Sequence, residues 1–221
     1  MNPDRGAAVS RLAEMIVRVD RPHPVRVCID GHTGAGKTTL ADELAPAIRV
    51  RSRPCIRASM DGFHRPRAER YRRGRSSPEG YYHDAFDYEA VRRLLLDPLG
   101  PRGDRKYQTA SHDLEQDEEA SAPVRTAVPR SVLVVDGSFL QRAELEGCWD
   151  FRVWVEVDVE TARARGVARD RGAFGPEIDR LYRERYLPAQ RLYVEEASPA
   201  DGADVRFMNN DVDHPVLVVP A

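Results

Sequence analysis

Residues 31–38 read Gly-His-Thr-Gly-Ala-Gly-Lys-Thr, and the apolar run Val25–Ile29 lies just before them. The stretch fits the pattern G-x-x-x-x-G-K-[ST] at every fixed position, between a predicted strand and a helix expected to begin near Lys37. In that context the backbone N–H groups of the loop can surround a phosphate, and a Cβ at the glycines would block its approach. We therefore interpret the stretch as a nucleoside-triphosphate site, and a glycine-rich turn without a ligand is the alternative.

The pattern assigns roles to single residues. Lys37 supplies positive charge for the β- and γ-phosphates, and the Thr38 hydroxyl can take one coordination place on Mg²⁺, so ATP and Mg²⁺ are the expected cofactors. Lysine occurs only at Lys37 and Lys106 among the 34 basic residues, which favours a specific need for a compact ammonium in the loop. The predicted nucleotide-binding residues of the loop are Gly31, Thr33, Gly34, Ala35, Gly36, Lys37, Thr38 and Thr39.

Length and composition are those of one globular domain. The chain has 221 residues, 41% hydrophobic and 32% charged, with a formal net charge of −2. This near-neutral balance does not favour a nucleic-acid or membrane partner, so we expect a small-molecule acceptor and allow for a homo-oligomer. Cys28, Cys55 and Cys148 are expected to be reduced thiols. Without an apolar run of signal-peptide or membrane-spanning type, a cytoplasmic location is expected.

Hydrophobic periodicity predicts alternating helices and strands. This alternation indicates an α/β fold with a doubly wound, mainly parallel sheet, the P-loop NTPase fold, in a single domain over residues 1–221. Residues 65–84 are expected to be a long loop, and segments 62–84, 104–129 and 165–176 to form the substrate side and a lid. The predicted strands are 25–29, 54–59, 131–137, 152–157 and 203–208, and the predicted helices are 7–19, 37–47, 86–96, 160–171 and 177–196, the last interrupted by Pro188.

Two carboxylates follow predicted strands. Asp61 comes after strand 54–59, and Asp136 comes at the end of the apolar run 132–135. In an open α/β sheet ligands gather at the carboxyl ends of the strands, so both acids are expected near Thr38. Phosphoryl transfer needs a metal on the phosphates and a group that receives the acceptor proton. We predict Asp61 as the acceptor-side catalytic base and Asp136 as a metal-side acid; the alternative is that either one caps the next element.

Together these residues resemble the uridine kinase-like group of P-loop kinases, which also contains phosphoribulokinase and bacterial pantothenate kinase. The resemblance spans about Val25 to Asn210. It is carried by the loop 31–38, Asp61-Gly62-Phe63-His64, Asp84-Ala85-Phe86-Asp87, the spacing of Tyr107 and His112, Asp136-Gly137 and the segment 161–170. It implies Asp61, Lys37 and Arg169 as catalytic residues, Thr38, Asp61 and Asp136 as metal ligands, and Arg165 and Arg171 as further phosphate-contacting residues. The implied acceptor-binding residues are Asp61, His64, Tyr82, Asp84, Tyr107 and His112.

The chain also departs from that group. Gly80-Tyr81-Tyr82-His83 lacks the acid that binds ribose in uridine kinases, and His64 replaces the usual Tyr. The expected function is an ATP-dependent small-molecule kinase acting on a hydroxyl, foremost of a nucleoside such as uridine or cytidine. A pantothenate kinase-like or sugar kinase activity is the alternative within this class. A nucleotide-dependent regulatory NTPase is the alternative of another class, although the Asn/Thr-Lys-x-Asp signature of guanine recognition is absent.

Six arginines lie close together at positions 65, 67, 70, 72, 73 and 75, with only Glu69 to offset them. We interpret this segment as a solvated surface loop. Steering of an anionic acceptor and contact with RNA are the alternatives.

Overall fold

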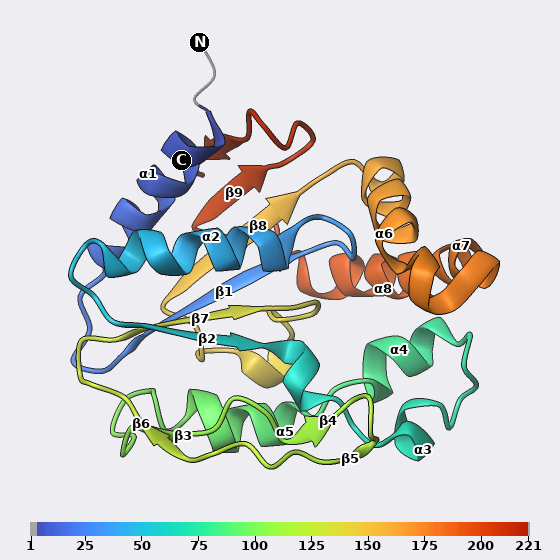
Figure 1. Ribbon diagram of the computed structural model, residues 1–221, viewed down its shortest axis with the longest axis horizontal. Helices are drawn as coiled ribbons and strands as arrows, with labels where there is room; N and C mark the ends of the chain where they lie inside the picture. The colour runs from blue at the N-terminus through green and yellow to red at the C-terminus, as the bar shows by residue number, and fades with distance from the viewer. Residues whose placement is uncertain (1–3, 221) are drawn as a thin grey trace.

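A six-stranded sheet in the order β10-β9-β8-β1-β7-β2 runs through the middle of the protein (Figure 1). The structure is a computed structural model that describes residues 4–220. Neighbouring strands are parallel except at the edge, where β10 pairs antiparallel with β9. The mainly parallel α/β fold predicted from the sequence is confirmed. The strands are β1 (Val25–Gly31), β2 (Cys55–Ser59), β7 (Val132–Asp136), β8 (Phe151–Glu156), β9 (Val205–Met208) and β10 (Val216–Val218).

The strand register brings the functional segments to one edge of the sheet. Asp136 at the end of β7 pairs with Ile29 of β1 on one side and with Ser59 of β2 on the other. The glycine-rich loop after β1 and the acidic residue after β2 therefore leave the sheet level with Asp136. The predicted convergence of these segments follows from this register.

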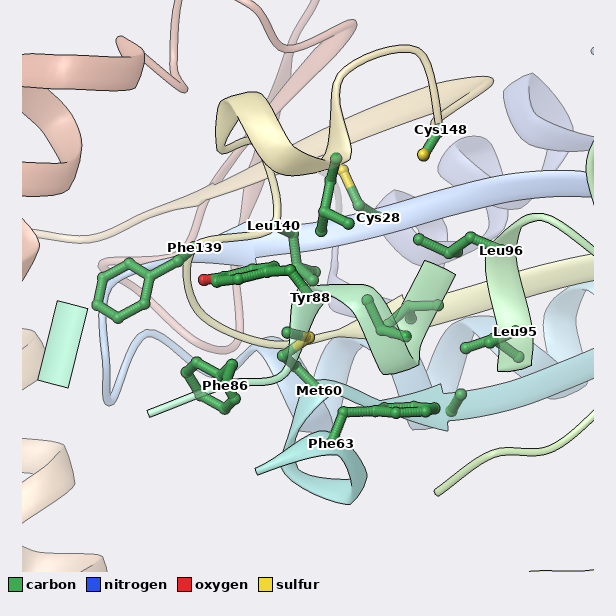
Figure 2. Packing of buried hydrophobic residues seen from close by; sticks show 14 of the residues in the cluster. Cys28, Met60, Phe63, Phe86, Tyr88, Leu95, Leu96, Phe139, Leu140 and Cys148 are labelled. Atoms are coloured by element: carbon green, nitrogen blue, oxygen red, sulfur yellow. The ribbon is translucent and has the colours of Figure 1, made fainter. Parts of the chain in front are cut away.

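Helices cover both faces of the sheet. On one face α1 (Arg5–Val17) and α2 (Lys37–Arg49) enclose a first core with the side chains of β1, β7 and β8 that point toward them. On the other face lie α4 (Pro78–Asp84), α5 (Tyr88–Val91) and α8 (Leu187–Ala197). Figure 2 shows part of this second core, in which Cys28 of β1 lies near side chains from the segments after β2 and α5. The sheet is thus doubly wound.

Shorter elements surround the carboxyl ends of the strands. Figure 1 shows α6 (Val159–Phe174), α7 (Ile178–Leu181) and α4 gathered at that end of the molecule. Two small antiparallel pairs, β3 (Lys106–Tyr107) with β6 (Arg125–Thr126) and β4 (His112–Asp113) with β5 (Glu118–Glu119), occupy the predicted substrate-side excursion. The remaining elements are α3 (Arg67–Arg70), the 3₁₀ turns η1 (Met60–Phe63), η3 (Ala143–Leu145) and η4 (Gly175–Glu177), and the π-helical turns η2 (Arg92–Leu96) and η5 (Tyr182–Tyr186). No helix within residues 4–220 is long and apolar enough to cross a membrane.

The predicted loop 65–84 is wrong, because it contains α3 and α4. The start signal of α4 was in the sequence: the Ser77 side chain accepts a hydrogen bond from Gly80 N at 2.9 Å, and Pro78 occupies the first turn. The predicted helix 86–96 begins only at Tyr88, because the Asp87 side chain caps it by accepting from Ala90 N at 2.9 Å.

Pro188 was expected to interrupt the last helix, but it does not. The helical run continues from α7 through η5 into α8, and Pro188 lies in the first turn of α8 directly after the π-helical turn. The wider turn and the N-terminal position accommodate a residue that has no N–H to donate. The edge strand β10 was not predicted, because three residues give too little pattern to recognise.

Candidate active site

The glycine-rich loop closes around the ammonium of Lys37. Lys37 Nζ donates to the carbonyl oxygens of Gly31 and His32, both at 2.9 Å. Gly34 has φ +87°, and a Cβ there would stand 2.1 Å from the carbonyl oxygen of Ala162 in α6. Only glycine fits this close approach of two backbones. The loop thus has the geometry that the sequence pattern predicts.

A buried carboxylate fixes the first residue of the loop. Asp30 is fully buried and accepts hydrogen bonds from Gly31 N at 2.7 Å, from Leu140 N at 3.1 Å and from the hydroxyl of Tyr193 in α8. Burial raises the pKa of Asp30 to about 6, although these three donors and the positive Lys37 oppose the rise. The hydrogen bond between Tyr193 and Asp30 connects the loop to α8. The sequence analysis did not predict it, because Tyr193 is 163 positions away from Asp30.

A cavity of about 590 Å³ opens over the loop at the start of α2. Among the predicted nucleotide-binding residues it is lined by Gly34, Gly36, Lys37, Thr38, Thr39 and Arg165. Arg165 is held by hydrogen bonds to the carbonyl oxygens of Asn209 and Asn210 at 2.8 and 2.6 Å. The rest of the lining consists of Arg5, Gly166, Arg169, Asn209, Val212 and Asp213, and of these the sequence predicted only Arg169.

Thr38 and Asp136 meet at the phosphate side of this cavity. Thr38 Oγ1 donates to Asp136 Oδ2 at 2.6 Å, and Arg57 Nη2 lies 3.0 Å from Asp136 Oδ1. Hydroxyl and carboxylate oxygens are the donors that Mg²⁺ prefers, and this ion usually takes its other ligands from phosphates and water. The residues present therefore fit Mg²⁺ held with a nucleotide. Within residues 4–220 no group of three or more His, Cys, Asp or Glu could hold a metal ion by itself.

A second cavity of about 360 Å³ adjoins the first and shares Gly34, Lys37, Thr38 and Arg169 with it. Asp61, Asp136 and Thr33 also line it. The Asp61 side chain is 73% exposed, so it is accessible from this cleft. Partial desolvation and the negative charge of Asp136 raise the pKa of Asp61, while Lys37 opposes the rise. We call this second cavity the acceptor cleft.

His64 lies beside Asp61 in the acceptor cleft as a neutral imidazole. Burial, and then the positive charges of Arg70 and other nearby groups, lower the pKa of His64 to about 3. Its ring stacks on Phe86 at 4.4 Å, and Nδ1 is 3.1 Å from the carbonyl oxygen of Ala85. A neutral ring must donate from Nδ1 to that carbonyl, which leaves Nε2 unprotonated, 3.7 Å from Asp61 Oδ1. This nitrogen can accept a hydrogen bond from a bound hydroxyl.

Seven predicted site residues line neither cavity: Gly31 and Ala35 of the loop, and five residues elsewhere. Tyr82 is 1% exposed in the second core, with the Arg142 guanidinium 4.0 Å from its ring centroid. Tyr107 is also buried in that core. The Asp84 carboxylate binds Arg72 and Arg73 and so anchors the basic segment instead of a substrate.

His112 and Arg171 are the other two of these five residues, and each has its contacts away from both cavities. His112 Nε2 lies 3.1 Å from the carboxylate of Asp117 and is buried there. Arg171 faces a separate hollow beside Arg163 and Asp179. In this structure these five residues lie away from both cavities, and the contacts that the family resemblance implies for them stay predictions.

The basic segment is solvated only in part: Arg67, Arg72, Arg73 and Arg75 are exposed as expected, but Arg70 is 6% exposed. Arg70 and Arg75 of this segment line the acceptor cleft together with Tyr71, Tyr81, Arg185 and Tyr186. The sequence analysis placed segment 62–84 on the substrate side but named none of these six as a site residue. The Ser77-Pro78 sequence is a start signal for a helix at α4. Helical periodicity then places Tyr81 and Tyr82 on different sides of that helix. Arg185 and Tyr186 come from the π-helical turn η5, which no sequence pattern indicates.

No family model matches the chain. Similarity in sequence and similarity in structure both lead to uridine kinases. The chain is 23% identical to a uridine kinase of Clostridium botulinum over 180 residues, 80% of this chain and 84% of that protein. It is 27% identical to uridine-cytidine kinase B of Dictyostelium discoideum, over 78% of this chain and 70% of that protein. The solved structure of a "possible uridine kinase" from Bacillus stearothermophilus superposes with a TM-score of 0.72 and 25% identity, covering 91% and 97% of the two chains.

These likenesses extend over most of the chain. They imply ATP as the phosphoryl donor and a small molecule as the acceptor. The chain is thus a distant homologue of uridine kinase-like P-loop kinases, and these likenesses support a small-molecule kinase of that group.

Proposed function

We propose that this protein transfers the γ-phosphoryl group of ATP to a hydroxyl of a small acceptor that binds in the acceptor cleft. The observation that carries the proposal is the shared wall of the two cavities. Lys37, Thr38 and Arg169 line both, and Asp61 faces the second one. A phosphoryl group held at Lys37 can therefore be approached from the acceptor cleft, as transfer between two bound molecules requires.

Different groups of the chain bind the phosphates, hold the metal and accept the proton. The loop N–H groups and Lys37 hold the phosphates, and Thr38 and Asp136 hold Mg²⁺, which supplies positive charge to the phosphate oxygens when it is bound. Asp61 receives the proton of the acceptor hydroxyl, and its raised pKa makes it a better base than an ordinary carboxylate. Arg169, which pairs with Asp170 at 2.6 Å, brings a further positive charge to the wall between the cavities.

The acceptor can be one of two kinds. A nucleoside such as uridine or cytidine is supported by the named activities of the relatives. Against it stands the placement of Tyr82, Asp84 and Tyr107, which lie outside the cleft. A carboxylate-bearing acceptor of the pantothenate type, or a sugar, is the second candidate, and the arginines of the cleft favour an anionic one.

The test is ADP release from ATP·Mg²⁺ with uridine, cytidine, pantothenate, glycerate or a simple sugar, compared with no acceptor. We expect at least one acceptor to raise the rate, and we expect Lys37→Met to abolish both the basal and the stimulated rates. Slow ATP hydrolysis that no small hydroxyl compound accelerates would contradict the kinase proposal and favour a regulatory NTPase.

A further inference from the structure

Arg185 is a buried cation without an anionic partner. Its residue is 6% exposed, and within residues 4–220 its guanidinium makes no hydrogen bond and no ion pair. Instead it is surrounded by rings: the guanidinium carbon lies 4.8 Å from the ring centroid of Tyr81, 5.1 Å from that of Tyr71 and 5.3 Å from that of Tyr186. The same four residues line the acceptor cleft.

A second buried arginine, which has only one carboxylate partner, lies near it. Arg70, also 6% exposed, has one hydrogen bond from Nη2 to Asp117 at 3.2 Å, and its buried Nε has no partner among the described residues. Its guanidinium carbon lies 5.4 Å from the ring centroid of Tyr71, which Arg185 also contacts. Two cations therefore share one aromatic ring, with a single carboxylate near one of them.

Two buried guanidinium groups with only one carboxylate partner are energetically unfavourable unless a ligand supplies further negative charge. A buried charge costs several kcal/mol when it is not paired, and each aromatic contact offsets only about 2 kcal/mol of that cost. Burial is the main cause of the lowered pKa of His64, and the positive charges of Arg70 and Arg185 lower it further. A rigid, desolvated pair of guanidinium groups with free N–H donors is the arrangement that binds a carboxylate or a phosphate strongly.

We propose that the acceptor carries an anionic group, a carboxylate or a phosphate, which binds to Arg185 and Arg70 in the acceptor cleft. The inference rests on the proposed function, since it names the class of acceptor for that reaction. The anion would fix one end of the acceptor while its hydroxyl lies at Asp61. Neutral nucleosides are then poor acceptors.

The test uses small anions as probes, so it does not depend on knowing the acceptor. The full-length protein is saturated with AMP-PNP·Mg²⁺ to fill the phosphate loop, and inorganic phosphate or glycerate is titrated while thermal unfolding is followed at constant ionic strength. We expect one or both anions to raise the unfolding temperature of the wild type, and the responding anion identifies the group as phosphate or carboxylate. Glycerol, the neutral counterpart of glycerate, is expected to have no effect.

The decisive comparison is between matched variants. Arg185→Met should weaken binding of the responding anion about 10- to 100-fold without changing AMP-PNP affinity. Arg180→Met makes the same chemical change in an exposed arginine that pairs with Glu177, and it should bind the anion as the wild type does. Arg185→Lys, which keeps the charge but loses the planar fork, should give an intermediate affinity.

Stability separates this role from a structural one. Because Arg185→Met removes an unpaired cation from a largely apolar site, its urea midpoint should equal or exceed that of the wild type. The inference is overturned if neither anion stabilises the wild type or if Arg185→Met binds the anion equally well. Loss of AMP-PNP affinity in Arg185→Met would likewise overturn it, by assigning the guanidinium to the nucleotide. The proposed kinase function fails by a different result, namely that no acceptor stimulates ADP release.

Discussion

Replacing Tyr193 with Phe removes one hydroxyl from below the phosphate loop, and the cost should depend on pH. That hydroxyl donates to the buried carboxylate of Asp30 and accepts a hydrogen bond from Gln141 N at 2.9 Å. A hydrogen bond to a charged group contributes about 1.5–3 kcal/mol, and a neutral one about 1 kcal/mol. We therefore expect Tyr193→Phe to lower the free energy of unfolding by about 3 kcal/mol at pH 8.

The pKa of Asp30 sets the direction of the pH dependence. It is about 6 in the folded protein, compared with about 3.9 in an unfolded chain. The folded state therefore keeps the proton over this interval, and the free energy of unfolding falls as pH rises through it, by about 3 kcal/mol for this group. At pH 5 Asp30 is mostly protonated in wild type and variant alike, so both hydrogen bonds of the hydroxyl are neutral and the cost of Tyr193→Phe should shrink to about 2 kcal/mol.

Urea unfolding followed by circular dichroism at pH 5 and pH 8 measures both values. The control is Tyr88→Phe, because the buried Tyr88 hydroxyl has no hydrogen-bond partner among residues 4–220, so its removal should be neutral or stabilising at both pH values. An equal loss of stability for Tyr193→Phe at pH 5 and pH 8 would refute the assignment of the hydroxyl to a charged Asp30.

Three further substitutions test the nucleotide site. Gly34→Ala should reduce affinity for a fluorescent ATP analogue more than tenfold, because φ +87° costs about 1–2 kcal/mol with a Cβ and that Cβ meets the Ala162 carbonyl oxygen at 2.1 Å; near-normal affinity would argue against the loop geometry. Asp136→Asn should lower the ADP-release rate roughly 100-fold and raise the Mg²⁺ concentration it needs, and an unchanged Mg²⁺ dependence would exclude a metal-side role. Arg171→Ala should leave ATP affinity within about twofold, since its side chain faces a separate hollow, and a large loss would restore it to the phosphate site.

The parts of the site that the sequence predicts are those fixed by local rules. Residues 31–38 carry their own geometry, since the glycines at 34 and 36 take the positive φ values that the loop needs. Asp136 was predictable because it ends an apolar strand, and parallel strands bring their carboxyl ends to one edge.

The acceptor side was predictable only in part, because it depends on how separate segments pack. Tyr82 and Tyr81 are adjacent in the sequence, yet only the second lines the cleft. Arg70 and Arg185 are brought to the same ring of Tyr71 from segments more than a hundred positions apart. Such a pairing leaves no spacing or periodicity by which the sequence could indicate it.

The proposed catalysis is tested most directly by Asp61→Asn under conditions where an acceptor stimulates the wild type. The account predicts that the acceptor-stimulated kcat falls about 10²- to 10⁴-fold, while ATP affinity is unchanged because Asp61 faces the acceptor cleft and is not among the residues lining the nucleotide cavity. In the wild type kcat/KM should rise with pH as Asp61 loses its proton, with an apparent pKa above that of an ordinary aspartate. An Asp61→Asn enzyme that keeps the stimulated rate and its pH profile would contradict the central claim that this carboxylate receives the acceptor proton.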